Sequence, residues 1–224
     1  MCIKLVIFDN DGVLCDAREI HFDSLNMAIV EWQERSAFHD YSITEEEHIK
    51  IYNGLPTLVK LDLLTKNKRL PVESYKVIDR LKQEYTTKLI KEKIKAKDYT
   101  HIHEVLSWLR AKGYQIHCAS NCSPDTLHLM LEMAGHKQYF HRIFSNVDVK
   151  KCKPDPEIYL KSAYIAGVHP FDVLVVEDSP KGIAAVRAAH MNLLQVDSPK
   201  QVTLDSVRST IETIDNYNDQ YQGK

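Results

Sequence analysis

The sequence predicts an α/β protein in which an all-helical segment interrupts a doubly wound parallel sheet. Three observations predict this class. Short apolar runs end in turn or polar residues, as strands buried on both faces of a parallel sheet do. From about residue 100 these runs alternate with helical patterns, which indicates βαβ units. Between residues 17 and 95 the apolar residues keep helical spacing, and no strand pattern is evident.

The first strand is predicted at residues 4–8, where the run Lys-Leu-Val-Ile-Phe ends in a cluster of turn residues. The clearest buried strand is the continuous apolar run at residues 173–176. Further strands are predicted at residues 114–119, 143–145 and 193–196. Because helical patterns separate these runs, the strands are expected to lie parallel in one sheet.

Helices account for the segment of residues 17–95. The apolar residues of its first helix keep helical spacing: Leu25, Ala28, Ile29 and Trp32. Leucines recur every three residues at 58–64, and another helical pattern covers residues 75–89. Thr44 and Glu47 form a capping box, in which the Thr44 hydroxyl accepts the Glu47 amide and the Glu47 side chain reaches back.

Helices are also predicted between the later strands. They cover residues 102–110, 124–134, 156–166 and 184–189. Ser123 stands at the N-cap position before Pro124, and Gly167 follows the end of the third of these helices. The polar residues 216–224 are expected to fray.

The length of 224 residues exceeds that of a minimal doubly wound domain. The pattern predicts an α/β core domain formed by residues 1–16 and 96–224. It predicts a second, helical domain at residues 17–95, inserted after the first strand.

Composition argues against several classes of protein. The hydrophobic fraction is 44 % and the charged fraction is 27 %, both ordinary for a globular protein. The net charge of −2 argues against a nucleic-acid partner and against a polybasic membrane anchor. No apolar run is long enough to cross a membrane, and the five cysteines lack zinc-ligand spacing. We therefore expect a reduced, cytoplasmic protein without nucleic-acid or membrane partners.

Acidic and hydroxyl residues follow three of the predicted strands at their carboxyl ends. They are Asp9, Asp11, Ser120, Glu177 and Asp178. Open parallel sheets bind ligands at this edge. Carboxylates that converge there repel one another and favour a bound cation, and a ligand set of oxygens alone favours Mg²⁺.

Lys153 lies in a loop between two strands and supplies a compact positive charge. Together with the Ser120 hydroxyl, it suits the oxygens of a phosphate group bound to Mg²⁺. A carboxylate at such a site can act as a covalent nucleophile while a second one transfers protons. The residues therefore indicate a phosphoryl-transfer site.

Four short motifs resemble those of the haloacid dehalogenase superfamily. In chain order they are Phe8-Asp9-Asn10-Asp11-Gly12-Val13-Leu14, Ser120-Asn121, Lys153-Pro154-Asp155-Pro156-Glu157-Ile158-Tyr159 and Val176-Glu177-Asp178-Ser179-Pro180-Lys181-Gly182. Each motif is short, but all four occur in the order of the family, at strand ends or in the loops that follow. The resemblance implies a Rossmann-like core with a helical cap domain, as in the branch of phosphoglycolate phosphatase and β-phosphoglucomutase.

The resemblance implies a role for each matching acidic residue. Asp9 would attack phosphorus and form an aspartyl-phosphate. Asp11 would protonate the leaving oxygen and then deprotonate the attacking water. The side chains of Asp9 and Asp178 and the backbone carbonyl of Asp11 would hold Mg²⁺, and Glu177 would bind the metal directly or through water.

The resemblance also implies which residues bind the phosphate. Ser120 and Lys153 would stabilise the phosphoryl group during its transfer. Gly12 and Asn121, which lie within the same motifs, are assigned to phosphate binding beside them.

Three residues of the helical segment are assigned to the substrate. His21 matches a histidine that contacts the acid/base aspartate in the β-phosphoglucomutase branch, and the alternative is an exposed helical histidine. The run from Gly54 to Thr57 resembles the specificity loop of the cap, whose glycine permits close approach. The alternative is an interhelix turn capped by Thr57.

Asp11 favours phosphoryl transfer over dehalogenation, because an alkoxide leaving group needs a proton and a halide does not. The predicted function is Mg²⁺-dependent hydrolysis of a small phosphorylated metabolite, a sugar phosphate or similar ester, by a monomer or dimer. The alternative is a β-phosphoglucomutase-type sugar phosphomutase, although no arginine closely follows Gly54 as in the mutase pattern. A non-catalytic binding protein and a phosphonate hydrolase are two further alternatives.

Overall fold

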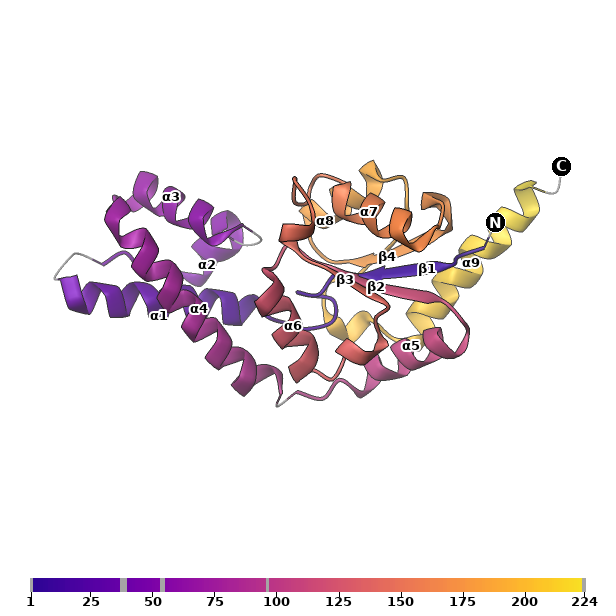
Figure 1. The fold of residues 1–224 in the computed structure, drawn as a ribbon, viewed down its shortest axis with the longest axis horizontal. Coiled ribbons are helices and arrows are strands. Elements are labelled where there is room, and N and C mark those ends of the chain that lie inside the picture. Colours follow the sequence, from indigo (N-terminus) through magenta and orange to yellow (C-terminus); the bar gives the residue numbers. More distant parts are fainter. Residues whose placement is uncertain (1, 37–39, 53–54, 96, 223–224) are drawn as a thin grey trace. The chain divides into compact units, whose positions relative to one another are not determined.

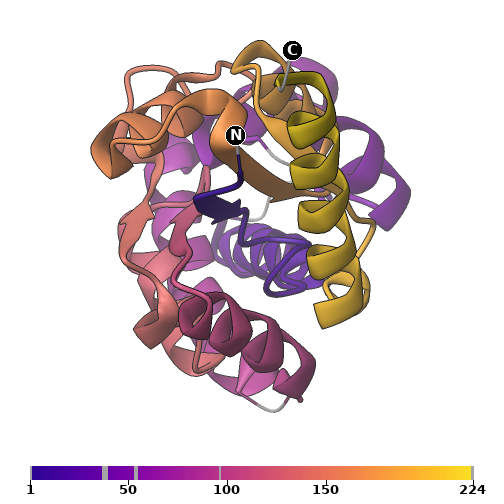
Figure 2. The same ribbon diagram turned by 90° about the vertical axis from the view of Figure 1, so that its right-hand side faces the viewer.

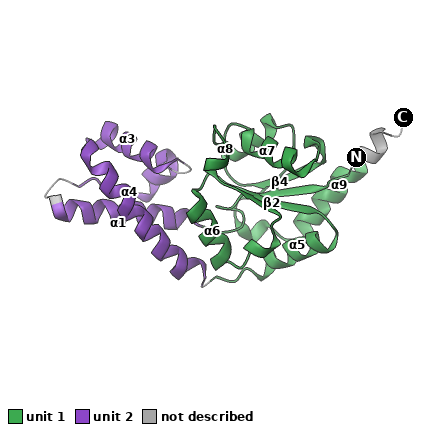
Figure 3. Cartoon of the chain, in the orientation of Figure 1, with its two compact units in different colours: residues 1–16, 97–224 green, residues 17–96 purple. Residues whose placement is uncertain are grey.

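The computed structural model describes residues 2–36, 40–52, 55–95 and 97–222. The chain divides into two compact units, one formed by residues 1–16 and 97–224 and the other by residues 17–96 (Figure 3). The second unit is thus inserted after the first strand of the first unit. Among the described residues, no helix has both the length and the apolar character needed to span a bilayer.

The first unit is built on a sheet of five parallel strands in the order β3-β2-β1-β4-β5 (Figure 1). The strands are β1 (Leu5–Phe8), β2 (Gln115–Ala119), β3 (Arg142–Phe144), β4 (Val173–Glu177) and β5 (Asn192–Gln195). All the predicted strands are confirmed, and no strand end differs from its prediction by more than one residue. The α/β class with a parallel sheet is confirmed as well.

Strands β1 and β4 have the most completely buried side chains, because helices cover both faces of the sheet. Every side chain of these two strands is buried. Helices α7 and α8 pack on one face, and α5 and α9 pack on the other (Figures 1 and 2). The helices of this unit are α5 (Thr100–Ala111), α6 (Pro124–Met133), α7 (Glu157–Ala166), α8 (Pro180–Ala188) and α9 (Leu204–Gln222), with short 3₁₀ turns at Lys137–Tyr139, Asn146–Asp148, Pro170–Asp172 and Pro199–Gln201.

Helix α9 corrects the prediction for the end of the chain. Residues 216–224 are expected to fray, but the helix continues as far as Gln222. Its buried residues Val207 and Ile211 lie one turn apart, and Asp215 accepts a hydrogen bond from the Ile3 amide at 2.8 Å. These contacts fix the helix as far as Asp215, and backbone hydrogen bonds can then extend it through the polar residues that follow. The polar composition of residues 216–224 was therefore a poor guide to whether they form a helix.

The second unit is helical throughout its described residues. Its helices are α1 (Arg18–Ser36), α2 (Glu45–Glu47), α3 (Thr57–Lys68) and α4 (Tyr75–Leu89), with π-helical turns at His48–Tyr52 and Ile90–Ile94 and a 3₁₀ turn at Val72–Ser74. Helices α1 and α4 pack along each other, and Leu25 and Ile29 join Leu61, Leu64 and Ile78 in a separate core. The second unit therefore has a hydrophobic core of its own.

Two predicted helix starts have different outcomes. The capping box is confirmed, because the Glu47 amide donates to the Thr44 hydroxyl at 3.1 Å and the Thr44 amide donates to Glu47 at 2.9 Å. Ser123 does stand at the N-cap of α6, but its hydroxyl donates to Thr126 Oγ1 at 2.9 Å instead of accepting a backbone amide. Position alone therefore does not determine what a capping side chain binds.

The buried histidine of β2 links stability to pH. His117 is only 1 % exposed, and its Nδ1 lies 2.8 Å from the Ser162 hydroxyl. Burial lowers the pKa of His117 from 6.5 to about 4, and the positive charges of His141 and Arg142 act in the same direction. The unfolded chain therefore takes up a proton at a pH where the folded protein does not.

We predict that His117 makes the protein less stable as the pH falls from 6.5 to about 4. Its contribution is complete above the unfolded pKa and is lost through this window, since only the unfolded state is protonated there. Urea unfolding should show that the wild type loses about 1.4 kcal/mol per pH unit more than His117→Met across this range. An equal pH dependence in the two proteins would contradict the lowered pKa.

Candidate active site

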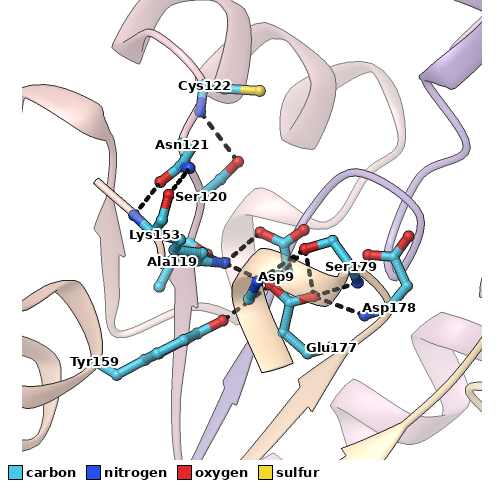
Figure 4. Close-up of polar contacts among 11 residues, drawn as sticks. Asp9, Ala119, Ser120, Asn121, Cys122, Lys153, Tyr159, Glu177, Asp178 and Ser179 are labelled. Carbon is cyan, nitrogen blue, oxygen red and sulfur yellow. Dashed lines mark hydrogen bonds and ion pairs between the residues drawn. The ribbon is translucent and has the colours of Figure 1, made fainter. Parts of the chain in front are cut away.

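The loops after β1 and β4 and the loop before α7 bring one lysine and three carboxylates together in the first unit (Figure 4). Phe8 of β1 pairs with Val176 of β4, so Asp9 and Glu177 leave neighbouring strands side by side. The Asp9 amide donates to the Val176 carbonyl at 3.0 Å, which holds the start of the loop against β4. The carboxyl edge of the sheet is thus the candidate site.

The Lys153 ammonium lies at the centre of the site. Its Nζ donates to Asp9 Oδ1 at 2.8 Å, to Glu177 Oε1 at 2.9 Å and to the Ala119 carbonyl at 2.9 Å. The same atom lies 4.7 Å from the ring centre of Tyr159. An ammonium has three N–H donors, and all three are engaged here. Lys153 therefore ties together the carboxyl ends of β1, β2 and β4.

Glu177 is fully buried and accepts hydrogen bonds on both carboxylate oxygens. Oε1 accepts from Lys153 and, at 3.2 Å, from the Tyr159 hydroxyl. Oε2 accepts from the amides of Asp178 at 2.7 Å and Ser179 at 2.8 Å, and from the Ser179 hydroxyl at 3.2 Å. Burial alone would raise the pKa of Glu177, but Lys153 and these amides lower it below its usual value.

Asp9 has the opposite electrostatic balance. Burial raises the pKa of its carboxyl to about 7, and the charges of Glu177 and Asp11 add to that effect, although Lys153 opposes it. Burial alone would lower the pKa of Lys153, but Asp9 and Glu177 raise it well above its ordinary range. Additional positive charge beside Asp9 would therefore favour its ionised form at neutral pH.

Three carboxylates of this cluster are close enough together to hold a cation. Asp9, Glu177 and Asp178 each offer a carboxylate oxygen, and these oxygens lie within 4.8 Å of one another. A set of oxygen donors with net negative charge suits a hard divalent cation. This group of three does not include the Asp11 carboxylate, whose charge nevertheless raises the pKa of Asp9. The metal contact that the resemblance implies for the Asp11 backbone carbonyl stays a prediction.

The loop of residues 10–15 closes on itself. The amides of Leu14 and Cys15 both donate to the Asn10 carbonyl at 2.9 Å, and the Gly12 amide donates to the Cys15 carbonyl at 2.7 Å. Gly12 has a φ of +88°, and a Cβ there would lie 2.0 Å from an Asp178 carboxylate oxygen. Gly12 thus lies against Asp178, and only glycine fits both the backbone and the contact.

Asn121 and Ser120, which were assigned to the phosphate, both bond to the backbone of the site. The Asn121 side chain accepts the Lys153 amide at 3.1 Å and donates to the Lys153 carbonyl at 3.3 Å. The Ser120 hydroxyl accepts the Cys122 amide at 3.2 Å. Asn121 therefore orients the loop that carries Lys153, while the Ser120 hydroxyl hydrogen is available to an incoming group.

Sequence reasoning gave no role to Tyr159, Ser179 or Gly182. Tyr159 is fully buried, with its hydroxyl on Glu177 and its ring beside Lys153. The Gly182 amide donates to the Ser179 hydroxyl at 3.0 Å, and a Cβ at Gly182 would lie 1.5 Å from Glu177 Oε1. All three occur in the quoted motifs, but their neighbours become visible only in the folded chain.

The assigned residues of the helical segment belong to the second unit. His21 lies in α1, and Thr57 is the first residue of α3. The N-cap of α3 is Pro56, so Thr57 does not cap the helix, which corrects that alternative by one position. Gly54 lies outside the described residues. The proposed contacts of His21 and Thr57 with the substrate stay predictions.

The arrangement combines buried carboxylates with the fixed positive charge of Lys153. Asp9 and Glu177 each contact Lys153 and belong to the group of carboxylates that could hold a metal. Such a site can bind a substrate that bears negatively charged oxygens and can stabilise the charge that develops during attack.

Comparison with known proteins relates this site to a family. The model of the family described as haloacid dehalogenase-like hydrolase matches residues 6–196. A phosphorylated carbohydrates phosphatase of Thermotoga maritima is 27 % identical over 192 residues, which cover 84 % of this chain and 82 % of that protein. A β-phosphoglucomutase of Bacillus subtilis is 27 % identical over 194 residues, or 84 % of this chain and 81 % of that protein.

Solved structures support the same fold. The crystal structure of a β-phosphoglucomutase from Clostridium difficile superposes with a TM-score of 0.77 at 22 % identity. The match covers 94 % of this chain and 98 % of that chain. It therefore includes both the α/β unit and the inserted helices.

The contact of Gly182 with Glu177 leads to a prediction about stability. Alanine in place of a helical glycine normally stabilises a protein by up to about 1 kcal/mol. Here the added methyl group would displace the Glu177 carboxylate from Lys153, so we expect Gly182→Ala to cost about 3 kcal/mol or more, as breaking a buried ion pair does. Urea unfolding measures the difference.

A double-mutant cycle provides the control. In a Glu177→Ala background the carboxylate is absent, so Gly182→Ala should be neutral or stabilising there. An equal loss of stability in both backgrounds would show that the Gly182–Glu177 contact is not the cause.

Proposed function

The chain belongs to the haloacid dehalogenase-like hydrolase family, and on that premise we propose that it is a Mg²⁺-dependent phosphatase of a small phosphorylated metabolite. The observation that carries the proposal is the contact of Lys153 with Asp9, next to three carboxylate oxygens that suit a metal ion. These groups supply a nucleophile, a fixed cation and a metal site at one strand edge.

Asp9 acts as the nucleophile in this proposal. One of its oxygens attacks phosphorus, the bond between phosphorus and the leaving oxygen breaks, and an aspartyl-phosphate forms. Water then attacks phosphorus and releases inorganic phosphate, which regenerates the Asp9 carboxylate. Because burial raises the pKa of Asp9 to about 7, positive charge is needed to keep it ionised.

Asp11 transfers protons in both steps. It protonates the leaving alkoxide when the aspartyl-phosphate forms, and it then accepts a proton from the attacking water. Asp11 is half-buried, and its carboxyl is outside the group of three carboxylates that could hold a metal. A halide would need no such proton, which favours an ester of phosphate over a haloacid.

Side chains of Asp9, Asp178 and Glu177, together with the Asp11 carbonyl, would hold Mg²⁺. The chemistry that Mg²⁺ supplies when bound is neutralisation of charge on the phosphate oxygens and on Asp9. The Lys153 ammonium supplies positive charge beside the phosphate, the Ser120 hydroxyl donates to a phosphate oxygen, and Asn121 holds the backbone of Lys153 in place.

The second unit, residues 17–96, serves as the cap in this proposal. Relatives of this chain include a phosphatase of phosphorylated carbohydrates, which supports a sugar phosphate or a similar small ester as substrate. His21, Gly54 and Thr57 are the proposed substrate-facing residues of that unit. The five free cysteines are consistent with action in the reducing cytoplasm.

A sugar phosphomutase is the second candidate, and the similarity to a β-phosphoglucomutase favours it. The products of the reaction distinguish the two functions: a phosphatase releases inorganic phosphate, and a mutase forms an isomeric sugar phosphate. With β-glucose 1-phosphate and a bisphosphate activator, a mutase yields glucose 6-phosphate, whereas a phosphatase yields glucose and inorganic phosphate.

Hydrolysis of phosphate monoesters tests the proposed function. Purified wild type with Mg²⁺ should release phosphate from members of a panel of phosphorylated metabolites. Asp9→Asn should abolish turnover because the amide cannot attack, and Asp11→Asn should lower it by about 10²-fold or more. Asp125→Asn, an exposed change in α6, should leave the rate unchanged. Absence of turnover on every ester would refute a phosphatase.

Thermal unfolding tests the metal site independently of turnover. Mg²⁺ at about ten times its dissociation constant should stabilise the wild type by about 1.4 kcal/mol. Asp178→Asn replaces one of the three carboxylates by a neutral amide, a weaker ligand for a hard cation, and should lose most of this stabilisation, whereas Asp125→Asn should keep it. A full Mg²⁺ response from Asp178→Asn would place the metal elsewhere.

A further inference from the structure

A cluster of aromatic rings, two of them buried, contacts the loop of residues 10–15, and the proposed function does not use it. His136 has no exposed surface. Its ring centre lies 5.0 Å from that of Tyr99 and 5.0 Å from that of His103, both in edge-to-face geometry. His103 in turn stacks on Tyr139 at 5.7 Å. Aromatic packing thus holds the His136 ring from two sides.

One polar contact joins this cluster to the loop. His136 Nε2 lies 3.3 Å from the Leu14 carbonyl. A carbonyl oxygen can only accept, so the hydrogen of the neutral ring is on Nε2 and is donated to Leu14. Burial lowers the pKa of His136 to about 4, and the charge of His103 adds to this effect, so the ring is neutral at neutral pH. Its only N–H is therefore committed to the loop.

The loop that receives this bond is closed by hydrogen bonds among its own residues. Asn10 accepts the amides of Leu14 and Cys15, and Cys15 accepts the amide of Gly12. Since these bonds close the loop on itself, its orientation depends on contacts with its surroundings. The Asp9 amide anchors the start of the loop on Val176, and His136 anchors the end at Leu14. Asp11 lies between these two anchors.

We propose that His136 is a positioning residue, whose hydrogen bond to the Leu14 carbonyl orients the loop so that the Asp11 carboxyl meets the leaving oxygen. This inference rests on the proposed function, in which Asp11 is the general acid. His136 touches neither the substrate nor the metal in this scheme. It acts through the backbone of residues 10–15.

His117 offers a matched control. It is also a buried histidine whose pKa burial lowers to about 4. Its ring contacts Ser162 on α7, however, and not the loop. Replacing either histidine perturbs the core of the first unit, but only replacement of His136 removes a contact with the loop of Asp11.

Substrates with different leaving groups distinguish a misplaced Asp11 from a general loss of structure in the variant. An alkyl phosphate leaves as a strongly basic alkoxide and needs a proton from Asp11, whereas p-nitrophenyl phosphate leaves as a weakly basic phenolate and needs little help. The ratio kcat/KM includes steps up to the release of the alcohol, so it reports this first transfer. A lost acid should therefore slow the alkyl ester more than the aryl ester.

The experiment compares His136→Met with His136→Gln, because the two side chains are nearly the same in shape and only glutamine keeps an N–H donor. We expect His136→Met to lower kcat/KM about tenfold or more for an alkyl phosphate that the wild type hydrolyses, and about threefold or less for p-nitrophenyl phosphate. His136→Gln should recover most of the alkyl activity. His117→Met should change both esters by the same small factor.

Two outcomes would overturn the inference while the wild type remains active. One is an equal loss on both esters in His136→Met, and the other is a loss in His136→Gln as large as that in His136→Met. If His136→Met does not fold, His136→Asn takes its place, because the shorter asparagine amide cannot reach the Leu14 carbonyl. The same comparison of the alkyl and aryl esters then applies. A wild type inactive on all esters would instead refute the proposed function itself.

Discussion

The buried ammonium of Lys153 is the interaction on which the rest of the site depends. It contacts Asp9, Glu177 and the Ala119 carbonyl, so one side chain joins the ends of three strands. A buried charge is stable only when its partners are complete, and here all three N–H donors are engaged. Breaking any of these contacts would leave a buried charge without its full set of partners. This cost explains why many neighbouring residues help to maintain the contacts of Lys153.

The neighbouring residues support Lys153 and its partners in different ways. Tyr159 donates to Glu177 and places its ring beside the ammonium, while Asn121 holds the backbone of Lys153. Gly182 leaves space for the Glu177 carboxylate, and Gly12 leaves space for Asp178. These four residues thus support the site through their contacts with Lys153, Glu177 and Asp178. Their common effect is to hold the proposed nucleophile, the Lys153 ammonium and the carboxylates that could bind a metal in one arrangement.

Local patterns predicted much of the fold. The apolar runs located all five strands within one residue at each end, because strands buried on both faces need continuous apolar sequence. Helix α9 was missed, because it has few apolar positions and its polar remainder resembles a disordered tail. The alternative interpretation of the Gly54–Thr57 run placed the helix cap at Thr57, but the cap is Pro56 and the helix begins at Thr57. Such errors arise where tertiary contacts, rather than local propensity, decide the end of an element.

The sequence by itself determined the fold class, the order of the elements and the identity of the acidic and basic residues at the strand ends, because these depend on periodicity and on residue type. Tertiary structure alone decided what each residue contacts. It grouped the carboxylates of Asp9, Glu177 and Asp178, placed the Asn121 amide on the Lys153 backbone and brought His136 to Leu14. Those distances depend on how the sheet pairs and how the loops close, and residues more than 100 positions apart meet only after folding.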